Sequence, residues 1–405
     1  MSISIDNLCY EKIGYKDNEV KVLKSIDNNI KKICIPYSII HEGRIYFVTE
    51  IGCCAFENHL SLTTVEIPNS VTYIDKFAFA GCNSLSSIII PGSVTHIAEF
   101  TFKACSSLQS ITLQYGVTHI GKYCFDKCNS LKSIIIPDTL EFIGKGAFNG
   151  CSSLSAITLP KYLEELSSDA FYNCSSLESI SIPERITRIE SNVFSGCSSL
   201  RTVTFPTNLT RIGIGAFSGC HVLTLESLPE SITRIDSHAF AYCYAITSIA
   251  IPNSVTLDSG VFYGCSCLKS ISLPSTIDKI CNEIFGRCRS LEYISFPTNI
   301  TKIGDSSFCE CVKIKSIIIP DKVKYLGSCA FRSCKALNSV IIPNSVKEIG
   351  MKVFEDCTSL VLIKYLGTKQ QWKSIRKHDD WNKESQLKKV ECFDGDIKLG
   401  GLFNW

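Results

Sequence analysis

The sequence predicts a β-dominated repeat solenoid of the α/β type, and three observations lead to that fold class. Phenylalanine recurs every 23 residues from Phe56 to Phe354, except that the step from Phe240 to Phe262 is 22 residues. With the same period, a proline closes an apolar L-x-x-I-x-I-P segment, and a V-T-x-I segment follows it. A cysteine stands three residues after most of these phenylalanines. The chain therefore repeats one unit fourteen times, and no unit is long enough to bury its own apolar face.

A period of about 20–29 residues built on L-x-x-L-x-L is the signature of a leucine-rich repeat, and it predicts a curved, right-handed solenoid. Within one unit, Ile88 and Ile90 lie two residues apart, so both point into the core from one strand. Stacked strands of this kind form a parallel sheet on the concave face, and Pro91 ends the pairing because it lacks an N–H. The A/V-F-x-x-C spacing predicts a short 3₁₀ or α turn on the convex face. We expect Gly121 and its equivalents after V-T-x-I to supply a tight turn.

The chain is predicted to have three parts. Residues 1–50 do not follow the period and contain strand-like runs with a hairpin turn at residues 41–43, as a β-rich cap over the first repeat requires. Residues 51–360 hold the fourteen repeats. Residues 361–405 predict a C-terminal cap with a short helix and a strand, because Thr368 opens a T-x-x-Q capping pattern. No Pro-rich or Gly/Ser-rich linker interrupts the sequence, so we expect a single domain.

Composition argues against several classes of function. Forty-one Lys and Arg against 39 Asp and Glu leave a net charge of +2, so we expect no nucleic-acid partner. The sequence has no run of 18 apolar residues and no basic segment followed by an apolar one at its start, so we expect no membrane span and no secretory signal. It also lacks the common hydrolase, metalloprotease and nucleotide-binding motifs, so we expect no enzyme activity and no cofactor. These features together predict a monomeric, cytoplasmic protein.

The repeated unit L-x-x-I-x-I-P-x-S-V-T-x-I-G-x-x-A-F-x-x-C resembles the BspA-like leucine-rich repeats, also called the Treponema pallidum type. The resemblance covers roughly residues 30–396 and includes the segment IPYSIIHEGRIYFVTEIG before the first full repeat and YLGTKQQWKSI and CFDGDIKL after the last. The resemblance implies a protein that binds host proteins or other cells at the surface of a bacterium or protist parasite. It implies no catalytic residues. A surface adhesin or surface antigen, located at the cell surface or secreted, is therefore the alternative to an intracellular scaffold.

Thirteen of the 23 cysteines lie three residues after a phenylalanine, from Cys82 to Cys357, and the first repeat has His59 instead. Cysteine is small and apolar enough to fill the interior of a turn, and stacked side chains that point in parallel do not form disulfides. We therefore interpret these residues as a buried column of reduced thiols, which agrees with an intracellular protein. Some of the ten other cysteines stand close to a column cysteine, as in Cys309-x-Cys311, but no such pair has the second pair that a zinc site needs. A cysteine-based redox or metal protein is thus the less favoured alternative.

The candidate binding residues are those that vary between repeats at exposed strand positions. Ser and Thr flank most of the inward-pointing Ile positions, so the concave face is predicted to be rich in hydroxyl groups and nearly uncharged. Such a composition suits a binding face and an ordinary exposed strand alike. Tyr293, Ile318 and Ile341 interrupt this face with an apolar patch, which either a protein partner or the C-terminal cap would cover.

Arg188, Arg211 and Arg234 occupy the same position in three consecutive V-T-x-I segments and are predicted to stand about 5 Å apart. Such a stripe would hold an acidic peptide or a sulfated glycan. The competing interpretation is a solvated face whose charge is balanced by acidic residues of the same segments. These acidic residues are Glu184, Glu190, Glu230 and Asp236. The sequence thus predicts a non-enzymatic scaffold that binds a protein or glycan partner, and the arginine stripe favours an acidic or sulfated one.

Overall fold

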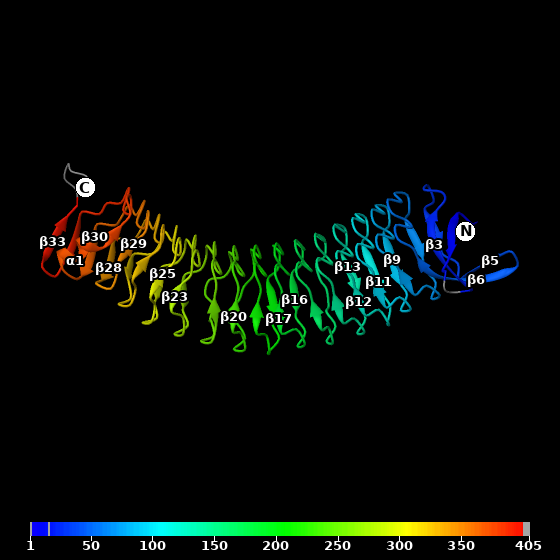
Figure 1. Ribbon diagram of the computed structural model, residues 1–405, viewed down its shortest axis with the longest axis horizontal. Coiled ribbons are helices and arrows are strands. Elements are labelled where there is room, and N and C mark those ends of the chain that lie inside the picture. The colour runs from blue at the N-terminus through cyan, green and yellow to red at the C-terminus, as the bar shows by residue number, and fades with distance from the viewer. Residues whose placement is uncertain (1, 15–16, 400–405) are drawn as a thin grey trace. The chain divides into compact units, whose positions relative to one another are not determined.

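The computed structural model describes residues 2–14 and 17–399. The chain forms two compact units, residues 1–208 and residues 209–405. In each unit the backbone coils as a β-dominated solenoid, and equivalent short strands of successive repeats pair in parallel (Figure 1). The described residues contain a single short α-helix. The predicted β-dominated repeat solenoid with parallel sheets is confirmed.

The first unit begins with strands that do not belong to the regular repeats. They are β1 (Ser2–Ile5), β2 (Leu8–Lys12), β3 (Glu19–Ser25), β5 (Ser38–His41) and β6 (Arg44–Ile51). β1, β2 and β3 are antiparallel neighbours, and β3 pairs in parallel with β6. β5 folds back on β6 as a hairpin, which confirms the turn predicted at residues 41–43. Ile39 and Tyr46 are buried on one face of this hairpin, so the hairpin packs onto the rest of the unit.

From residue 64 onward most repeats of the first unit contribute two short strands. The strands of the L-x-x-I-x-I segments and of their N-terminal equivalent are β4 (Lys32–Cys34), β7 (Thr64–Glu66), β9 (Ser87–Ile90), β11 (Ser110–Leu113), β13 (Ser133–Ile135), β16 (Ser179–Ser181) and β18 (Thr202–Thr204). The strands of the V-T-x-I segments are β8 (Tyr73–Ile74), β10 (His96–Ile97), β12 (His119–Ile120), β14 (Phe142–Ile143), β15 (Glu165–Leu166) and β17 (Arg188–Ile189). We call the exposed face of the first set the sheet face.

The second unit continues the same two sets. Its L-x-x-I-x-I strands are β22 (Ser270–Ser272), β24 (Tyr293–Ser295), β26 (Ser316–Ile318), β28 (Ser339–Pro343) and β30 (Leu362–Leu366). Its V-T-x-I strands are β19 (Arg211–Ile212), β20 (Arg234–Ile235), β21 (Thr256–Leu257), β23 (Lys279–Ile280), β25 (Lys302–Ile303), β27 (Tyr325–Leu326) and β29 (Glu348–Ile349). The terminal elements are α1 (Lys369–Ser374), β31 (Arg376–Lys377), β32 (Lys389–Cys392) and β33 (Gly395–Lys398).

The helix α1 begins with the capping box that the sequence predicts. The backbone N–H of Gln371 donates to the Thr368 hydroxyl at 3.3 Å, and the Gln371 side-chain oxygen accepts from the Thr368 backbone N–H at 2.8 Å. The division into caps at residues 1–50 and 361–405 around the repeats remains a prediction. Residues 1, 15–16 and 400–405 of these caps lie outside the described residues.

The phenylalanine column forms the centre of the core in both units. Within each unit, consecutive rings stack with interplanar angles between 1° and 27°, and all of these rings are buried. The ring centroids of Phe56 and Phe79 are 5.1 Å apart, whereas those on either side of Phe262 are 6.0 Å away. The wider spacing coincides with the 22-residue step, where the repeat has lost one residue. In the second unit the stack ends on Trp381, which meets the ring of Phe354 edge-on.

The turns around each phenylalanine are not helical, so the expected 3₁₀ or α turn is not confirmed. Alternate backbone N–H groups donate within the repeat and to the next repeat. Ala80 donates to the Phe77 carbonyl at 3.1 Å, and Gly81 donates to the Lys103 carbonyl at 2.7 Å. Phe77 and Gly81 have φ values of 58° and 70°, which no right-handed helix allows. Hydrogen bonds between repeats therefore replace those of a helix and join the repeats.

The glycine after V-T-x-I is required by close packing rather than by a special backbone angle. A Cβ at Gly121 would lie 2.6 Å from the Ile97 carbonyl oxygen, and a Cβ at Gly144 would lie 2.8 Å from the carbonyl carbon of Gly121. Neither glycine has a φ in the left-handed region. These glycines also begin a tight turn, as expected, because the N–H three residues later donates back to the glycine carbonyl, at 3.3 Å from Cys124 to Gly121 and at 3.1 Å from Ala147 to Gly144. The lack of a Cβ in addition lets successive repeats approach each other.

Candidate binding surfaces

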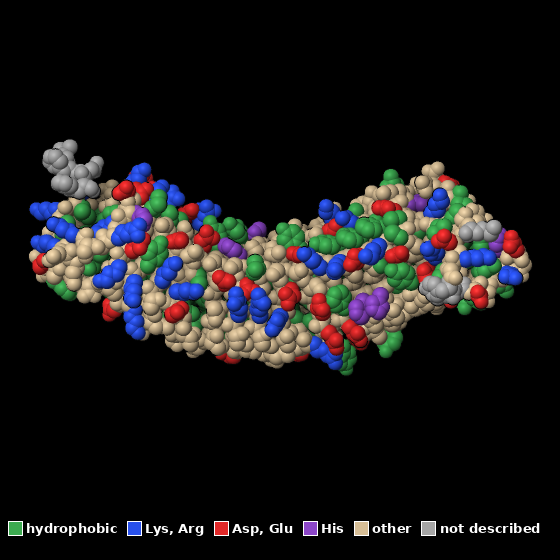
Figure 2. Space-filling view, in the orientation of Figure 1, with side chains coloured by type: hydrophobic (Ala, Val, Ile, Leu, Met, Phe, Trp, Pro, Cys, Tyr) green, Lys and Arg blue, Asp and Glu red, His purple; other side chains and the backbone are tan. Residues whose placement is uncertain are grey.

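The sheet face of the first unit presents hydroxyl groups in register. Ser87, Ser110 and Ser133 lie opposite one another on β9, β11 and β13, and all three are exposed. On the same strands Ile89 and Ile135, which are 55% and 63% exposed, flank a threonine. Figure 2 shows the wider surface, where neutral atoms cover much of the visible face of each unit and charges of both signs are scattered between them. A ligand for this surface would be recognised by shape and hydrogen bonds more than by overall charge.

The structure brings two of the predicted apolar residues together in the second unit. Tyr293 begins β24 and Ile318 ends β26, and their exposed fractions are 68% and 66%. With Ser295 and Pro320 they line a depression of about 340 Å³, which we call the sheet-face hollow. Ile341 pairs in register with Ile318 but is half-buried, so it lies beside the hollow rather than in it. The role of these three residues in binding remains a prediction.

The two predicted arginines of the second unit are held by one buried carboxylate. Arg211 and Arg234 lie opposite each other on β19 and β20. Asp236, which is 1% exposed, accepts from Arg211 Nε at 2.7 Å and from Arg234 Nε at 2.5 Å. Asp236 is one of the acidic residues expected to balance these segments, so part of the charge of both arginines is already compensated. Arg188 lies exposed on β17 of the first unit.

The thirteen cysteines are buried, as predicted, and their thiols have backbone acceptors along each unit. Cys82 Sγ donates to the Phe56 carbonyl at 3.1 Å, and the same bond recurs at 3.1–3.2 Å in later repeats. Burial raises the pKa of the Cys174 thiol well above its usual range. In the first repeat His59 replaces the cysteine, and its Nε2 lies 3.1 Å from the Asp27 carbonyl. Neutral, hydrogen-bonded thiols of this kind are poor nucleophiles and poor metal ligands.

Across residues 2–14 and 17–399, no group of three or more His, Cys, Asp and Glu side chains is placed to hold a metal ion. In the same part of the chain, the structure contains no helix with the length and apolarity that a membrane span requires.

We expect native-state alkylation to modify the exposed cysteines and to spare the buried column. Iodoacetamide at neutral pH should label Cys267 but not Cys174 or the other buried thiols. Two exposed cysteines should react slowly, because the hydrogen bond with Glu66 raises the pKa of Cys34 and desolvation raises that of Cys54 to about 12. Peptide mass mapping before and after urea unfolding measures the protection. Rapid labelling of Cys174 in the folded protein would contradict this assignment.

A second depression in the second unit was not predicted from the sequence. It is about 310 Å³ in volume and lies on the turns that follow three consecutive core phenylalanines. Its lining residues stand two and four positions after each phenylalanine, and they are Tyr242 and Tyr244, Gly264 and Ser266, and Arg287 and Arg289. We call this depression the turn hollow. The signal that would have revealed it is the run of large, small and basic side chains at these two offsets, which appears only when the repeats are aligned.

Stacked parallel strands, a shared phenylalanine core and variable exposed positions define a leucine-rich-repeat protein, a class that generally serves as a protein-binding scaffold. The family model described as a BspA type leucine rich repeat region matches residues 29–154, 118–247 and 233–361. The chain belongs to the BspA type leucine-rich-repeat family.

Solved structures of bacterial proteins have the same fold. A leucine-rich repeat protein from Bacteroides ovatus is 26% identical with a TM-score of 0.77, and the match covers 97% of this chain and 100% of that one. One from Eubacterium ventriosum is 17% identical with a TM-score of 0.54 over 98% and 100% of the two chains, which shows the fold alone. A leucine rich cell surface protein from Faecalibacterium prausnitzii is 24% identical over 93% of this chain and 97% of that one, with a TM-score of 0.49. No curated protein matches the chain in sequence.

Proposed function

We propose that the chain is a non-enzymatic scaffold that binds a protein partner through its sheet face. The observation that carries this proposal is the sheet-face hollow, where Tyr293 and Ile318 expose about two thirds of their side chains on a surface otherwise rich in hydroxyl groups. Covering apolar surface is favourable by roughly 25 cal/mol per Å². Tyrosine adds a rigid ring and a hydroxyl group, a combination that is enriched among the residues that dominate binding energies.

The scaffold contributes to affinity because it holds this surface in place before the partner arrives. Backbone hydrogen bonds between β26 and β28, and between β22 and β24, fix the strands on both sides of the hollow. A preorganised surface loses little conformational entropy on binding, so more of the contact energy appears as affinity. The hollow is small, which suits one or two side chains of a partner segment rather than a whole ligand domain.

This proposal is tested with peptides selected from a displayed library on the full chain. In the double variant Tyr293→Ser and Ile318→Thr, we expect the dissociation constant of selected peptides to rise at least tenfold, or about 1.4 kcal/mol. The substitutions introduce the residue types that occupy the same columns elsewhere, so the thermal midpoint should not change. The matched control is Ile89→Thr with Ile135→Thr on the first unit, where the side chains are 55% and 63% exposed. Unchanged affinity in the first variant, or an equal loss in the control, contradicts the proposal.

We further propose that the partner is acidic or sulfated, because three arginines, Arg188, Arg211 and Arg234, stand at equivalent positions of successive repeats. The side chains of Arg211 and Arg234 are 43% and 52% exposed, so guanidinium groups bonded to Asp236 still face solvent on one side. If they contact the partner, affinity should fall steadily as NaCl is raised, because exposed charges are screened by salt. Salt-independent affinity would remove the arginines from the proposed interface.

The alternative proposal is a cell-surface adhesin or surface antigen, which rests on the family resemblance. External protease applied to intact cells separates it from an intracellular scaffold. Loss of the chain from intact cells supports the adhesin, and full protection until lysis contradicts it. We also propose a monomer, for which light scattering after gel filtration should give a mass near 44.8 kDa.

A further inference from the structure

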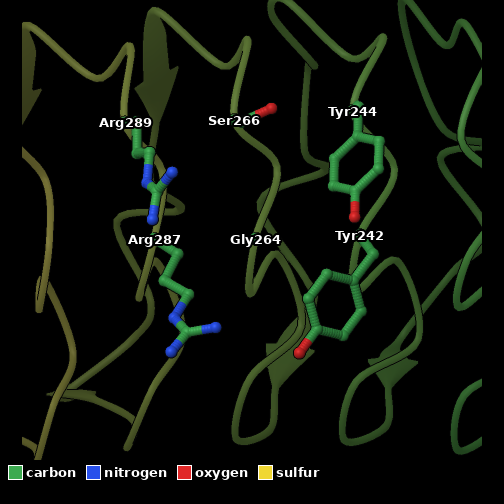
Figure 3. A pocket seen from close by; sticks show the side chains of 6 residues that line it. All are labelled: Tyr242, Tyr244, Gly264, Ser266, Arg287 and Arg289. Carbon is green, nitrogen blue, oxygen red and sulfur yellow. The ribbon is translucent and has the colours of Figure 1, made fainter.

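We propose that the turn hollow binds one acidic sugar residue, a hydroxylated ring that carries a single carboxylate. This site goes beyond the protein-binding function, because it lies on the turns and shares no residue with the sheet-face hollow. Figure 3 shows its arrangement, with Tyr242 and Tyr244 on one side and Arg287 and Arg289 on the other. The repeat between them carries only the small residues Gly264 and Ser266.

Small residues in the middle repeat create the space. Gly264 and Ser266 stand where the adjacent repeats carry tyrosine and arginine. Gly264 has a φ of 73°, and a Cβ at this position would lie 2.7 Å from Cδ1 of Tyr242. Tyr242 and Arg287 adopt nearly the same backbone angle at the equivalent positions, with φ values of 60° and 62°. Glycine is therefore needed at position 264 for the place of the Tyr242 ring rather than for the angle. The volume of about 310 Å³ lies at the small end of the range for ligand sites and suits a single ring.

The tyrosine wall is held rigid by its neighbours while part of each ring stays open. Tyr242 meets Tyr244 edge-on at a centroid distance of 6.3 Å and meets Tyr263 edge-on at 5.5 Å. Tyr244 also stacks on His221 at 4.8 Å. The two wall tyrosines remain 37% and 40% exposed. Such rings offer an apolar surface to the C–H groups of a sugar, and their hydroxyls, together with that of Ser266, offer hydrogen bonds to sugar hydroxyls.

The arginine wall is positioned by Glu310 of the following repeat. Arg287 Nε lies 3.2 Å from one oxygen of Glu310, and a terminal nitrogen of Arg289 lies 2.8 Å from the other. The guanidinium of Arg287 also lies 5.7 Å from the ring centroid of Tyr263. A guanidinium has five N–H donors, so most donors of both arginines are left for a ligand, and their side chains are 48% and 61% exposed.

The charge of this wall matches a singly charged anion. The hydrogen bond from Arg289 holds the pKa of Glu310 below its usual range, so Glu310 is ionised at neutral pH. Two arginines and one glutamate then sum to a single positive charge. A carboxylate balances that charge and accepts two parallel N–H bonds from a guanidinium. A phosphotyrosine side chain also combines a ring with an anion, but it carries a charge of about −1.5 to −2 and its ring has no hydroxyls for the tyrosine wall.

Calorimetry on the full chain with a galacturonate trisaccharide tests the inference. The matched neutral probe is the same trisaccharide with its carboxyl groups reduced, which should bind at least tenfold more weakly. Arg287→Gln with Arg289→Gln should lose at least tenfold in affinity, and so should Ser266→Tyr, which fills the hollow and leaves both arginines. The control is Arg185→Gln, because Arg185 also pairs with a glutamate, Glu164, and lies 5.1 Å from the ring centroid of Tyr162 without bordering this hollow.

Several results would overturn the inference. They are no saturable binding of the acidic trisaccharide, equal affinity for the reduced probe, wild-type affinity in both altered proteins, or an equal loss in Arg185→Gln. Tight binding of a phosphotyrosine peptide that Ser266→Tyr abolishes would assign the hollow to the other ligand. If the double arginine variant melts early, Tyr244→Ser replaces it, since that ring is partly exposed. Peptide binding at the sheet-face hollow is an independent readout, so failure here leaves the proposed protein-binding function standing.

Discussion

Phe148→Ala is expected to lower the free energy of unfolding by about 3–5 kcal/mol, the range for deleting a buried aromatic ring. Phe148 is fully buried, and its ring stacks at 5.3 Å on Phe125 and at 5.2 Å on Phe171. The surrounding backbone is held by hydrogen bonds between repeats, such as that from the Phe148 N–H to the Ala170 carbonyl at 2.8 Å. The cavity therefore cannot close easily. Because each repeat contacts only its neighbours, the substitution weakens two interfaces at once.

Urea unfolding of the full chain, followed by circular dichroism, measures this loss. Tyr115→Ala is the control, since Tyr115 is an aromatic residue of the same unit that is 80% exposed. The control should shift stability by no more than about 0.5 kcal/mol. An unfolding curve for Phe148→Ala that overlays the wild-type curve would show that the aromatic column does not stabilise the solenoid.

The core could be predicted from the sequence because its residues recur with the period of the repeat. Strand residues such as Ile88 and Ile90, the phenylalanines and the cysteines must superimpose on the next repeat, so each recurs at a fixed interval and each proves buried. The turn conformation could not be predicted in the same way. Phe77 and Phe100 adopt φ values of 58° and 59°, which bulky residues avoid on their own. Hydrogen bonds to the neighbouring repeat outweigh that local preference. The conformational preferences of single residues give no information about these bonds.

The candidate binding surfaces could likewise be predicted only in part. The sequence places Tyr293 and Ile318 on exposed strand positions, and the structure puts both at one hollow. The sequence also places Arg211 and Arg234 at equivalent positions of successive repeats. It does not reveal that the buried Asp236 carboxylate accepts hydrogen bonds from both. The turn hollow was missed because its residues belong to three repeats and none is unusual within its own repeat. Side-chain contacts between repeats depend on which residues occupy the same position in neighbouring repeats. The sequence of one repeat alone does not show this.

The second large loss of stability is expected from a substitution at Gly116. This glycine belongs to the repeat in which Gln114 stands where the neighbouring repeats have Pro91 and Pro137. Gly116 has a φ of 115°, and a Cβ there would lie 2.3 Å from the Gly92 carbonyl oxygen. Its N–H donates to the Thr139 hydroxyl at 3.1 Å, so the turn that contains Gly116 cannot shift without losing that bond. Gly116→Ala should therefore cost about 2–6 kcal/mol, the sum of about 1–3 for the backbone angle and about 1–3 for the overlap.

The matched control for Gly116→Ala is Gly14→Ala, because no heavy atom beyond the chain neighbours lies within 4 Å of a Cβ at Gly14. Both variants are compared with the wild type by urea unfolding, and only Gly116→Ala should lower the midpoint. Equal stability of the two variants would mean that the backbones of adjacent repeats can separate at this point without cost. The close approach of Gly92 and Gly116 would then be a consequence of stacking rather than a condition for it.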